Sequence, residues 1–265
     1  MSTLSNKIAL VTGGSRGLGR EMVLAFAAAG ADVVIASRKL EACEAVAREV
    51  EKLGRRALPV AAHVGKWDDN DALAARAYEQ FGRVDIVIPN AGICSGAKTW
   101  EISPEDWREM IDINLNGVFH TVKAAVPTLI AQNEGGSIVF IGSTEALKGA
   151  ENISSYAASK HGVTGLMTSL ARELGQYGIR VNSVNPTCVD THMINNDFVY
   201  GLFRPDLDKP TRADVVDTFT GTHILPVPWI DPSDVSNAIL YLVTEPGRYI
   251  TATTLVIDAG FIVKS

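Results

Sequence analysis

A tyrosine and a lysine four residues apart form the pair in this sequence best suited to proton transfer. Tyr156 and Lys160 stand in the segment Tyr-Ala-Ala-Ser-Lys, and a spacing of four places both side chains on one face of a helix. A phenol with an unperturbed pKa of about 10 transfers protons poorly near neutrality, whereas a neighbouring ammonium favours the phenolate. We therefore predict that Lys160 lowers the pKa of Tyr156 and makes it a general acid/base. Such a pair also arises by chance, so other motifs must support it.

A glycine-rich turn indicates a phosphate-bearing ligand. Residues 12–19 read Thr-Gly-Gly-Ser-Arg-Gly-Leu-Gly and lie between a short apolar run and a helical segment. Glycines let the backbone approach a pyrophosphate, and the following helix N-terminus offers unpaired N–H groups to the anion. The spacing differs from Gly-x-Gly-x-x-Gly, and no Walker Gly-Lys-Ser/Thr is present. The predicted cofactor contacts in this turn are Gly13, Ser15, Arg16, Gly17, Leu18 and Gly19.

The end of the second apolar run bears on the choice between NADP and NAD. A dinucleotide fold specific for NAD carries Asp or Glu there to hold the ribose 2′-hydroxyl. This chain has Ser37, Arg38 and Lys39 instead. Arg38, together with Arg16, would clamp a 2′-phosphate between two guanidinium groups. The sequence therefore favours NADP(H), with NAD(H) as the alternative.

Further candidates follow the later strands, because ligands of open α/β sheets bind at the carboxyl ends of the strands. They are Asn90, Ala91, Gly92, Asn114 and Ser143.

Taken together, these motifs resemble the short-chain dehydrogenase/reductase family in its single-domain form. The resemblance covers essentially the whole chain and includes a serine thirteen residues before the tyrosine of Tyr-x-x-x-Lys. It implies that Tyr156 is the general acid/base and that Ser143 hydrogen-bonds the substrate oxygen. It also implies that Tyr156 and Lys160 both contact the cofactor and that Lys160 binds the nicotinamide ribose. By the same resemblance, Asn114 holds a water in the proton relay. A homotetramer built on helices 118–132 and 155–177 is implied as well.

Three positions depart from the family pattern. His63 replaces the usual Asp beside the adenine, Thr187 replaces the Gly of the usual Pro-Gly pair, and Pro89 stands where another Asn is common. None of them touches the proposed proton chain. The remaining cofactor contacts implied by the resemblance are His63, Val64, Pro186 and Val189.

Short Val- and Ile-rich runs alternate with segments of helical periodicity, which is typical of a parallel sheet between helix layers. We therefore expect a Rossmann-like, doubly wound α/β fold with a seven-stranded parallel sheet, in a single domain over residues 1–265. The predicted strands are 8–11, 32–36, 57–61, 84–88, 137–141, 179–184 and 254–257. The predicted helices are 18–29, 40–53, 70–81, 104–114, 118–132, 155–177 and 232–243. Gly30, Gly54 and Gly82 stand where helices end, and Ser103 stands where one begins.

The stretch from Pro186 to Pro232 breaks this alternation, since it holds six of the eleven prolines and several aromatic residues. We predict that residues 187–230 form a substrate-binding lid, with a subunit contact as the alternative. The lid is similar to a carveol-dehydrogenase-like subgroup, whose members oxidise apolar secondary alcohols and generally use NAD. That similarity rests on Phe-Arg-Pro-Asp-Leu at 203–207, Leu-Pro-Val-Pro-Trp at 225–229 and Asp-Ala-Gly at 258–260. His192, Met193, Cys94 and Cys188 are expected to border the pocket.

Composition excludes several other classes of protein. The 265 residues are 46% hydrophobic and 20% charged, with a net charge of −6, which is typical of a globular enzyme and disfavours nucleic-acid binding. Three scattered cysteines suit a reducing compartment, so we expect a cytoplasmic protein. The longest apolar stretch, residues 22–31, is too short for a membrane span, and the five histidines lack metal-ligand spacing.

These observations predict an oxidoreductase that moves a hydride between NADP(H) and a small, largely apolar ketone or secondary alcohol. Two alternatives stay open. One is an NAD-dependent, carveol-dehydrogenase-like alcohol dehydrogenase, and the other is a non-catalytic dinucleotide-binding sensor.

Overall fold

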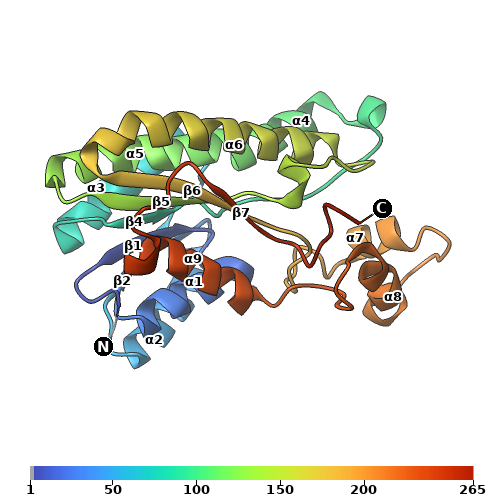
Figure 1. Cartoon of the computed structure of the whole chain (residues 1–265), viewed down its shortest axis with the longest axis horizontal. Helices are drawn as coiled ribbons and strands as arrows, with labels where there is room; N and C mark the ends of the chain where they lie inside the picture. The colour runs from blue at the N-terminus through green and yellow to red at the C-terminus, as the bar shows by residue number, and fades with distance from the viewer. Residues whose placement is uncertain (1–2, 265) are drawn as a thin grey trace.

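Seven parallel strands form the sheet around which the molecule is built (Figure 1). The structure is a computed structural model that describes residues 3–264. The strands are β1 (Ile8–Thr12), β2 (Asp32–Ser37), β3 (Ala57–Ala61), β4 (Ile86–Ile88), β5 (Gly136–Ile141), β6 (Ile179–Pro186) and β7 (Thr254–Ile257). Their order in the sheet is β3-β2-β1-β4-β5-β6-β7, and every neighbouring pair is parallel. The order of the strands reverses between β1 and β4, because β2 and β3 follow on one side of β1 and β4 to β7 follow on the other. Doubly wound folds bind their ligands at this switch point.

Helices cover both faces of this sheet. They are α1 (Gly17–Ala28), α2 (Leu40–Lys52), α3 (Trp67–Phe81), α4 (Pro104–Ile111), α5 (Gly117–Gln132), α6 (Ser154–Leu174), α7 (Asp197–Phe203), α8 (Arg212–Thr222) and α9 (Pro232–Val243). Short turns complete the chain: η1 (Thr99–Glu101), the π-helical η2 (Asp112–Asn116), η3 (Thr144–Ala146), η4 (Gly175–Tyr177) and η5 (Glu245–Gly247). Among the described residues, no helix is both long and apolar enough to cross a membrane.

Two hydrophobic cores lie on opposite faces of the sheet. One packs α1, α2 and α9 against it through buried side chains such as Phe26, Val46 and Ile239. The other packs α3, α5 and α6 through side chains such as Leu73 and Met167. Figure 1 shows these two helix layers above and below the strands. Because the central strands are covered on both faces, they read as continuous apolar runs, and the predicted doubly wound fold is confirmed.

The predicted strand 84–88 begins two residues later, at Ile86. The side chain of Gln132 explains the difference, because it occupies both backbone groups of Val84. Gln132 Oε1 accepts from the Val84 N–H at 2.8 Å, and Gln132 Nε2 donates to the Val84 carbonyl at 2.8 Å. Pro89 lies one residue beyond the end of β4, where its missing N–H breaks no ladder.

The helix predicted to start at Asn70 starts at Trp67. Asn70 is not a cap, because its amide donates to the carbonyls of Val64 at 2.8 Å and Lys66 at 2.7 Å and so secures the preceding loop. The acidic residues Asp68 and Asp69 occupy the first turn instead, where negative charge interacts favourably with the helix dipole.

The helix predicted to end at Asn114 ends at Ile111 and continues through the π-helical η2 into α5. Side-chain bonds of Asn114 to a neighbouring loop accompany this irregular turn, as described below. Elsewhere the last predicted turn of the helix 155–177 is η4 rather than α-helix, and β6 runs two residues beyond 184 because it pairs with β7 as far as Pro186. The remaining predicted ends agree within one residue.

The predicted turn signals are confirmed. Gly30, Gly54 and Gly82 all have positive φ, between 72° and 101°, in the left-handed region that favours glycine at a helix end. The Ser103 side chain caps α4 by accepting from the Asp106 N–H at 3.0 Å.

The segment between β6 and α9 folds into its own small unit at one end of the molecule. Figure 1 shows α7 and α8, drawn in orange, beyond the sheet and beside the C-terminus. Phe203 on α7 stacks on Phe219 on α8 with ring centroids 3.9 Å apart, and Val199 and Val215 are buried beside them. Arg212 donates to both carboxylate oxygens of Asp190 at 2.8 Å. The aromatic residues of this segment thus form a third core.

Candidate active site

A cleft of about 830 Å³ opens at the carboxyl ends of the strands, between the sheet and α7. Most residues predicted to bind cofactor or substrate line it. They are Gly13, Ser15, Arg16, Leu18, Gly19, Ser37, Arg38, His63, Val64, Asn90, Ala91, Gly92, Ser143, Tyr156, Lys160, Pro186 and Val189. Gly17 and Asn114 are the two candidates that do not line it.

The glycine turn is compact enough to exclude side chains. A Cβ at Gly19 would lie 2.1 Å from the carbonyl oxygen of Gly13, and Gly13 itself has φ +66°. Gly17, with φ +53°, faces the lid, because a Cβ there would meet the His192 ring at 3.1 Å. The turn therefore brings the N-terminus of α1 to the cleft. Gly17 itself lies outside the cleft, and its positive φ contributes to the bend of the turn.

Thr12 ties the glycine turn to the Asn-Ala-Gly loop, a role that sequence reasoning missed. Its Oγ1 accepts from the N–H of Asn90 at 3.1 Å and of Ala91 at 3.2 Å. Asn90 Nδ2 donates back to the Thr12 carbonyl at 2.9 Å. The sequence signal for this role was a hydroxyl side chain at the last position of β1, next to the glycine turn.

Three cations, Arg16, Arg38 and Lys39, line the end of the cleft near β2. Arg16 and Arg38 are exposed, and within residues 3–264 neither pairs with a carboxylate. Ser37 lies beside them, with its Oγ 3.1 Å from Cys43 Sγ. His63 faces the same end of the cleft, and its Nδ1 accepts from the Gly65 N–H at 3.2 Å. This end of the cleft therefore carries unpaired positive charge.

Ser143, Tyr156 and Lys160 come together in the middle of the cleft. Ser143 follows β5, and its Oγ accepts from the Glu145 N–H at 3.1 Å and is also hydrogen-bonded to the Tyr156 side chain. Asn185 holds the Ser143 backbone by donating to its carbonyl at 2.9 Å. Lys160 is only 6% exposed, and its Nζ donates to the Ile141 carbonyl at 2.8 Å, 5.6 Å from the centroid of the Tyr156 ring.

The prediction that Lys160 lowers the pKa of Tyr156 is wrong for this structure. Loss of solvent raises the pKa of the Tyr156 phenol well above its usual value, and its hydrogen bond with Ser143 offsets only part of that. The same loss of solvent lowers the pKa of Lys160 to about 8. The physical reason is that desolvation penalises both charged forms, while the lysine nitrogen is directed to the Ile141 carbonyl.

Asn114 acts on the wall of the cleft rather than inside it. Its side chain is fully buried; Oδ1 accepts from the Ile93 N–H and Nδ2 donates to the Ile93 carbonyl, both at 2.9 Å. These bonds hold the segment that follows Gly92. The side chain is thereby occupied, so a water in the relay would have to be held by the Asn114 backbone, and that role stays a prediction.

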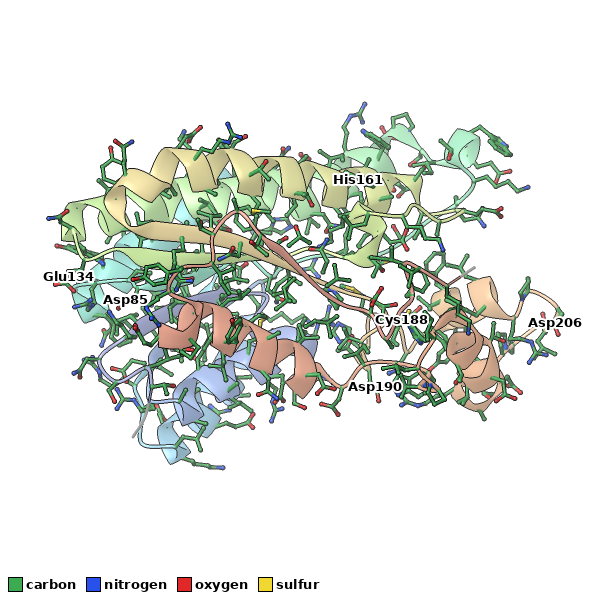
Figure 2. The ribbon with its side chains drawn as sticks, viewed as in Figure 1. Asp85, Glu134, His161, Cys188, Asp190 and Asp206 are labelled. Carbon is green, nitrogen blue, oxygen red and sulfur yellow. The ribbon has the colours of Figure 1, made fainter. Side chains whose placement is uncertain are left out.

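The lid lines the far end of the cleft with largely apolar side chains. They are Met193, Ile194, Val199, Leu202 and Phe203, together with His192. Cys94 and Cys188 also line the cleft, and burial raises their pKa values to about 11 and about 12, so both are thiols at neutral pH. Figure 2 shows Cys188 where the sheet meets the α7–α8 unit, and His161 on α6, which does not line the cleft.

Glu145 is a cleft residue that sequence reasoning missed. It lies two positions after Ser143 and is 8% exposed. Burial raises its pKa to about 7. Within the described part of the chain, no group of three or more His, Cys, Asp or Glu residues is arranged to hold a metal ion.

Comparisons with known proteins agree with this geometry. The short chain dehydrogenase family model matches residues 7–198. The (-)-trans-carveol dehydrogenase of Rhodococcus erythropolis is 44% identical, with all of both chains covered. The cyclohexanol dehydrogenase of an Acinetobacter species is 33% identical over 98% of this chain and 96% of its own length. A crystal structure of carveol dehydrogenase from Mycobacterium avium in complex with NAD superposes with a TM-score of 0.97 at 39% identity, covering both chains fully.

The match to the family model spans well over half of the chain, and the full-length relatives extend it to the lid. The cleft at the switch point of the sheet, the glycine turn and the Ser-Tyr-Lys group are thus parts of one known kind of enzyme. The chain belongs to the short-chain dehydrogenase family and is an oxidoreductase that uses a nicotinamide cofactor.

Proposed function

We propose that this enzyme interconverts a secondary alcohol and a ketone of largely apolar character, with Tyr156 as the general acid/base. The single observation that carries the proposal is the meeting of Ser143, Tyr156 and Lys160 in one cleft with the glycine turn. A non-catalytic sensor would have no need for a buried lysine beside a tyrosine and a serine oriented by a backbone N–H.

In the direction of reduction, Tyr156 donates its proton to the substrate oxygen. The raised pKa of its phenol keeps that proton in place at neutral pH. Ser143 donates a hydrogen bond to the same oxygen and stabilises the charge that grows on it. Lys160 binds the nicotinamide ribose from the floor of the cleft. A nicotinamide, when bound, supplies or accepts the hydride.

The cleft fits a dinucleotide cofactor. The glycine turn leaves no room for side chains where the backbone must approach a pyrophosphate, and the α1 N-terminus lies directly behind it. We propose that the glycine turn contacts this cofactor, together with Asn90, Ala91, Gly92, His63 and Val64. Lys160, Tyr156, Pro186 and Val189 complete the proposed set at the nicotinamide end.

We propose NADP(H) as the preferred cofactor. The supporting observation is that Arg16 and Arg38 line the cleft, exposed and without carboxylate partners within residues 3–264, and that Ser37 replaces the acid that holds a 2′-hydroxyl. The second candidate is an NAD-dependent, carveol-dehydrogenase-like alcohol dehydrogenase. It is favoured by the NAD complex of the Mycobacterium avium enzyme.

Residues 187–230 are proposed to be the substrate lid. Their side chains on α7 give the far end of the cleft its apolar walls, which suits a hydrocarbon ring such as those named for two of the relatives. We further propose a cytoplasmic homotetramer assembled on α5 and α6. Its supports are the family resemblance, the free cysteines and the exposed Phe119 on α5.

The experiment that tests the proposed function is Tyr156→Phe. Turnover of cyclohexanol and carveol should fall by about 10²- to 10⁴-fold, the usual contribution of a positioned acid/base, while cofactor affinity changes less than threefold. Steady-state kinetics and fluorescence titration measure the two. Tyr177→Phe, an exposed tyrosine in η4, is the matched control and should keep turnover. Unchanged turnover in Tyr156→Phe would refute the mechanism.

A further inference from the structure

Glu145 is a buried carboxyl in the cleft for which the proton-transfer chemistry has no use. It lies on η3 and lines the cleft. Its electrostatic interactions reach Tyr156, Cys94 and Cys188. Its backbone N–H donates to Ser143 Oγ at 3.1 Å, so the residue lies next to the Ser-Tyr-Lys group. It therefore faces the substrate rather than the adenine end of the cofactor.

The carboxyl of Glu145 is only half satisfied. It accepts a hydrogen bond from the backbone N–H of Ala150. Its Oε2 is buried and has no hydrogen-bond partner among residues 3–264. A buried polar atom left in this state costs about 1–3 kcal/mol, and native structures contain few of them. Because Oε2 is closed to solvent, the cost is recovered if the side chain turns toward the cleft and a bound molecule supplies the missing bond.

Charge around the cleft identifies the kind of group that would supply it. Lys148 and His161 favour the ionised form of Glu145, but burial outweighs them. Lys160 lines the same cleft, and Arg16 lies at its other end. The charged side chains that line the cleft are four cations, Arg16, Arg38, Lys39 and Lys160, and two carboxylates, Glu145 and Glu151. Cations are in the majority, so a cationic substrate would be repelled. A neutral hydroxyl donates a hydrogen bond without that penalty.

We propose that Glu145 is a specificity-determining residue whose Oε2 accepts a hydrogen bond from a second hydroxyl of the substrate. The preferred substrates are then secondary alcohols that carry another hydroxyl, or the corresponding hydroxyketones, rather than simple hydrocarbon alcohols. The hydrocarbon part contacts the apolar lid, and Glu145 fixes the orientation of the ring relative to Tyr156. This inference rests on the proposed oxidoreductase function and names its substrate class.

The test compares cyclohexanol with 1,2-, 1,3- and 1,4-cyclohexanediol, which share the ring and the reacting carbinol and differ by one hydroxyl. The measured quantity is the ratio of kcat/KM for each diol to kcat/KM for cyclohexanol. The wild-type enzyme should prefer at least one diol by about 10- to 100-fold, the worth of one satisfied buried hydrogen bond. Glu145→Leu should lower that ratio at least tenfold. Glu145→Gln, which keeps the shape and the ability to hydrogen-bond, should lower it less.

The outcomes separate the inference from the function on which it rests. Turnover of cyclohexanol with no preference for any diol would overturn the inference and leave the proposed function standing. A preference for a diol that survives Glu145→Leu would also overturn it, because the preference would then not depend on Oε2. Absence of turnover with every one of the four alcohols would overturn the proposed function and this inference with it.

Discussion

Replacing Glu145 by glutamine should remove a loss of stability that the wild-type protein suffers as the pH rises from about 5 to 8. The pKa of Glu145 is about 7 in the folded chain, against 4.5 for an ordinary glutamate. The folded state therefore binds more protons than the unfolded state between these two values, and the stability contributed by this group falls as the pH rises through that range. Glutamine has the same shape and never ionises, so it escapes this loss.

The magnitude follows from the two values. A tenfold difference in proton affinity corresponds to about 1.4 kcal/mol, so the change from 4.5 to about 7 amounts to at most about 3 kcal/mol. The stability of Glu145→Gln relative to wild type should therefore increase by up to that amount between pH 4.5 and pH 8. Most of the change should fall between pH 5 and pH 7.

Urea denaturation at pH 5 and pH 8 measures this difference, with ΔG taken by linear extrapolation. Protein concentrations must be equal, because the stability of an oligomer depends on concentration. Glu79→Gln, at an exposed position on α3, is the matched control and should leave the pH dependence unaltered. If Glu145→Gln shifts stability equally at pH 5 and pH 8, the buried carboxyl does not carry the raised pKa and the reasoning fails.

Two further predictions concern the ends of the cleft. Arg38→Asp should lower the affinity for NADP(H) relative to NAD(H) at least tenfold, because it removes a cation and adds an anion where the 2′-phosphate is expected; equilibrium titration with both cofactors measures the ratio. Arg76 is an exposed cation on α3 outside the cleft, so Arg76→Asp makes the same charge change and should not alter this ratio. If the two variants have the same ratio of NADP(H) to NAD(H) affinity, Arg38 does not select the cofactor. Phe219→Ala removes the ring that stacks on Phe203 and should raise the KM of a secondary alcohol at least fivefold with cofactor affinity nearly constant, as kinetics and titration will show. A parallel loss of both affinities would mean that the α7–α8 unit is not a substrate lid.

Much of the fold could be predicted because its signals are local. Apolar runs, helical periodicity and glycines at positive φ are properties of a few consecutive residues, and they located all seven strands. The ends of elements were less predictable where a distant side chain intervened. Gln132, some fifty residues away along the chain, occupies the backbone of Val84 and delays β4.

The candidate site divides in the same way. Ser143, Tyr156 and the glycine turn are recognisable from residue type and spacing, and parallel topology brings them to one cleft. Asn114 was recognised as well, but both polar atoms of its side chain are hydrogen-bonded to the backbone of Ile93. Residue spacing does not reveal that contact. Glu145 belongs to no motif. Its residue type and its position near a strand end therefore gave no reason to expect that its carboxyl is buried.

The sequence alone determined the kind of fold and located the glycine turn and the Ser-Tyr-Lys group that meet in the cleft, because each depends on short-range pattern. Only the tertiary structure decided the protonation of those residues. A pKa depends on how much water every surrounding element removes and on which polar groups remain within reach. That is why burial, contributed by segments far apart in the chain, raises the pKa of Tyr156 although a lysine lies nearby, and raises the pKa of Glu145 to about 7.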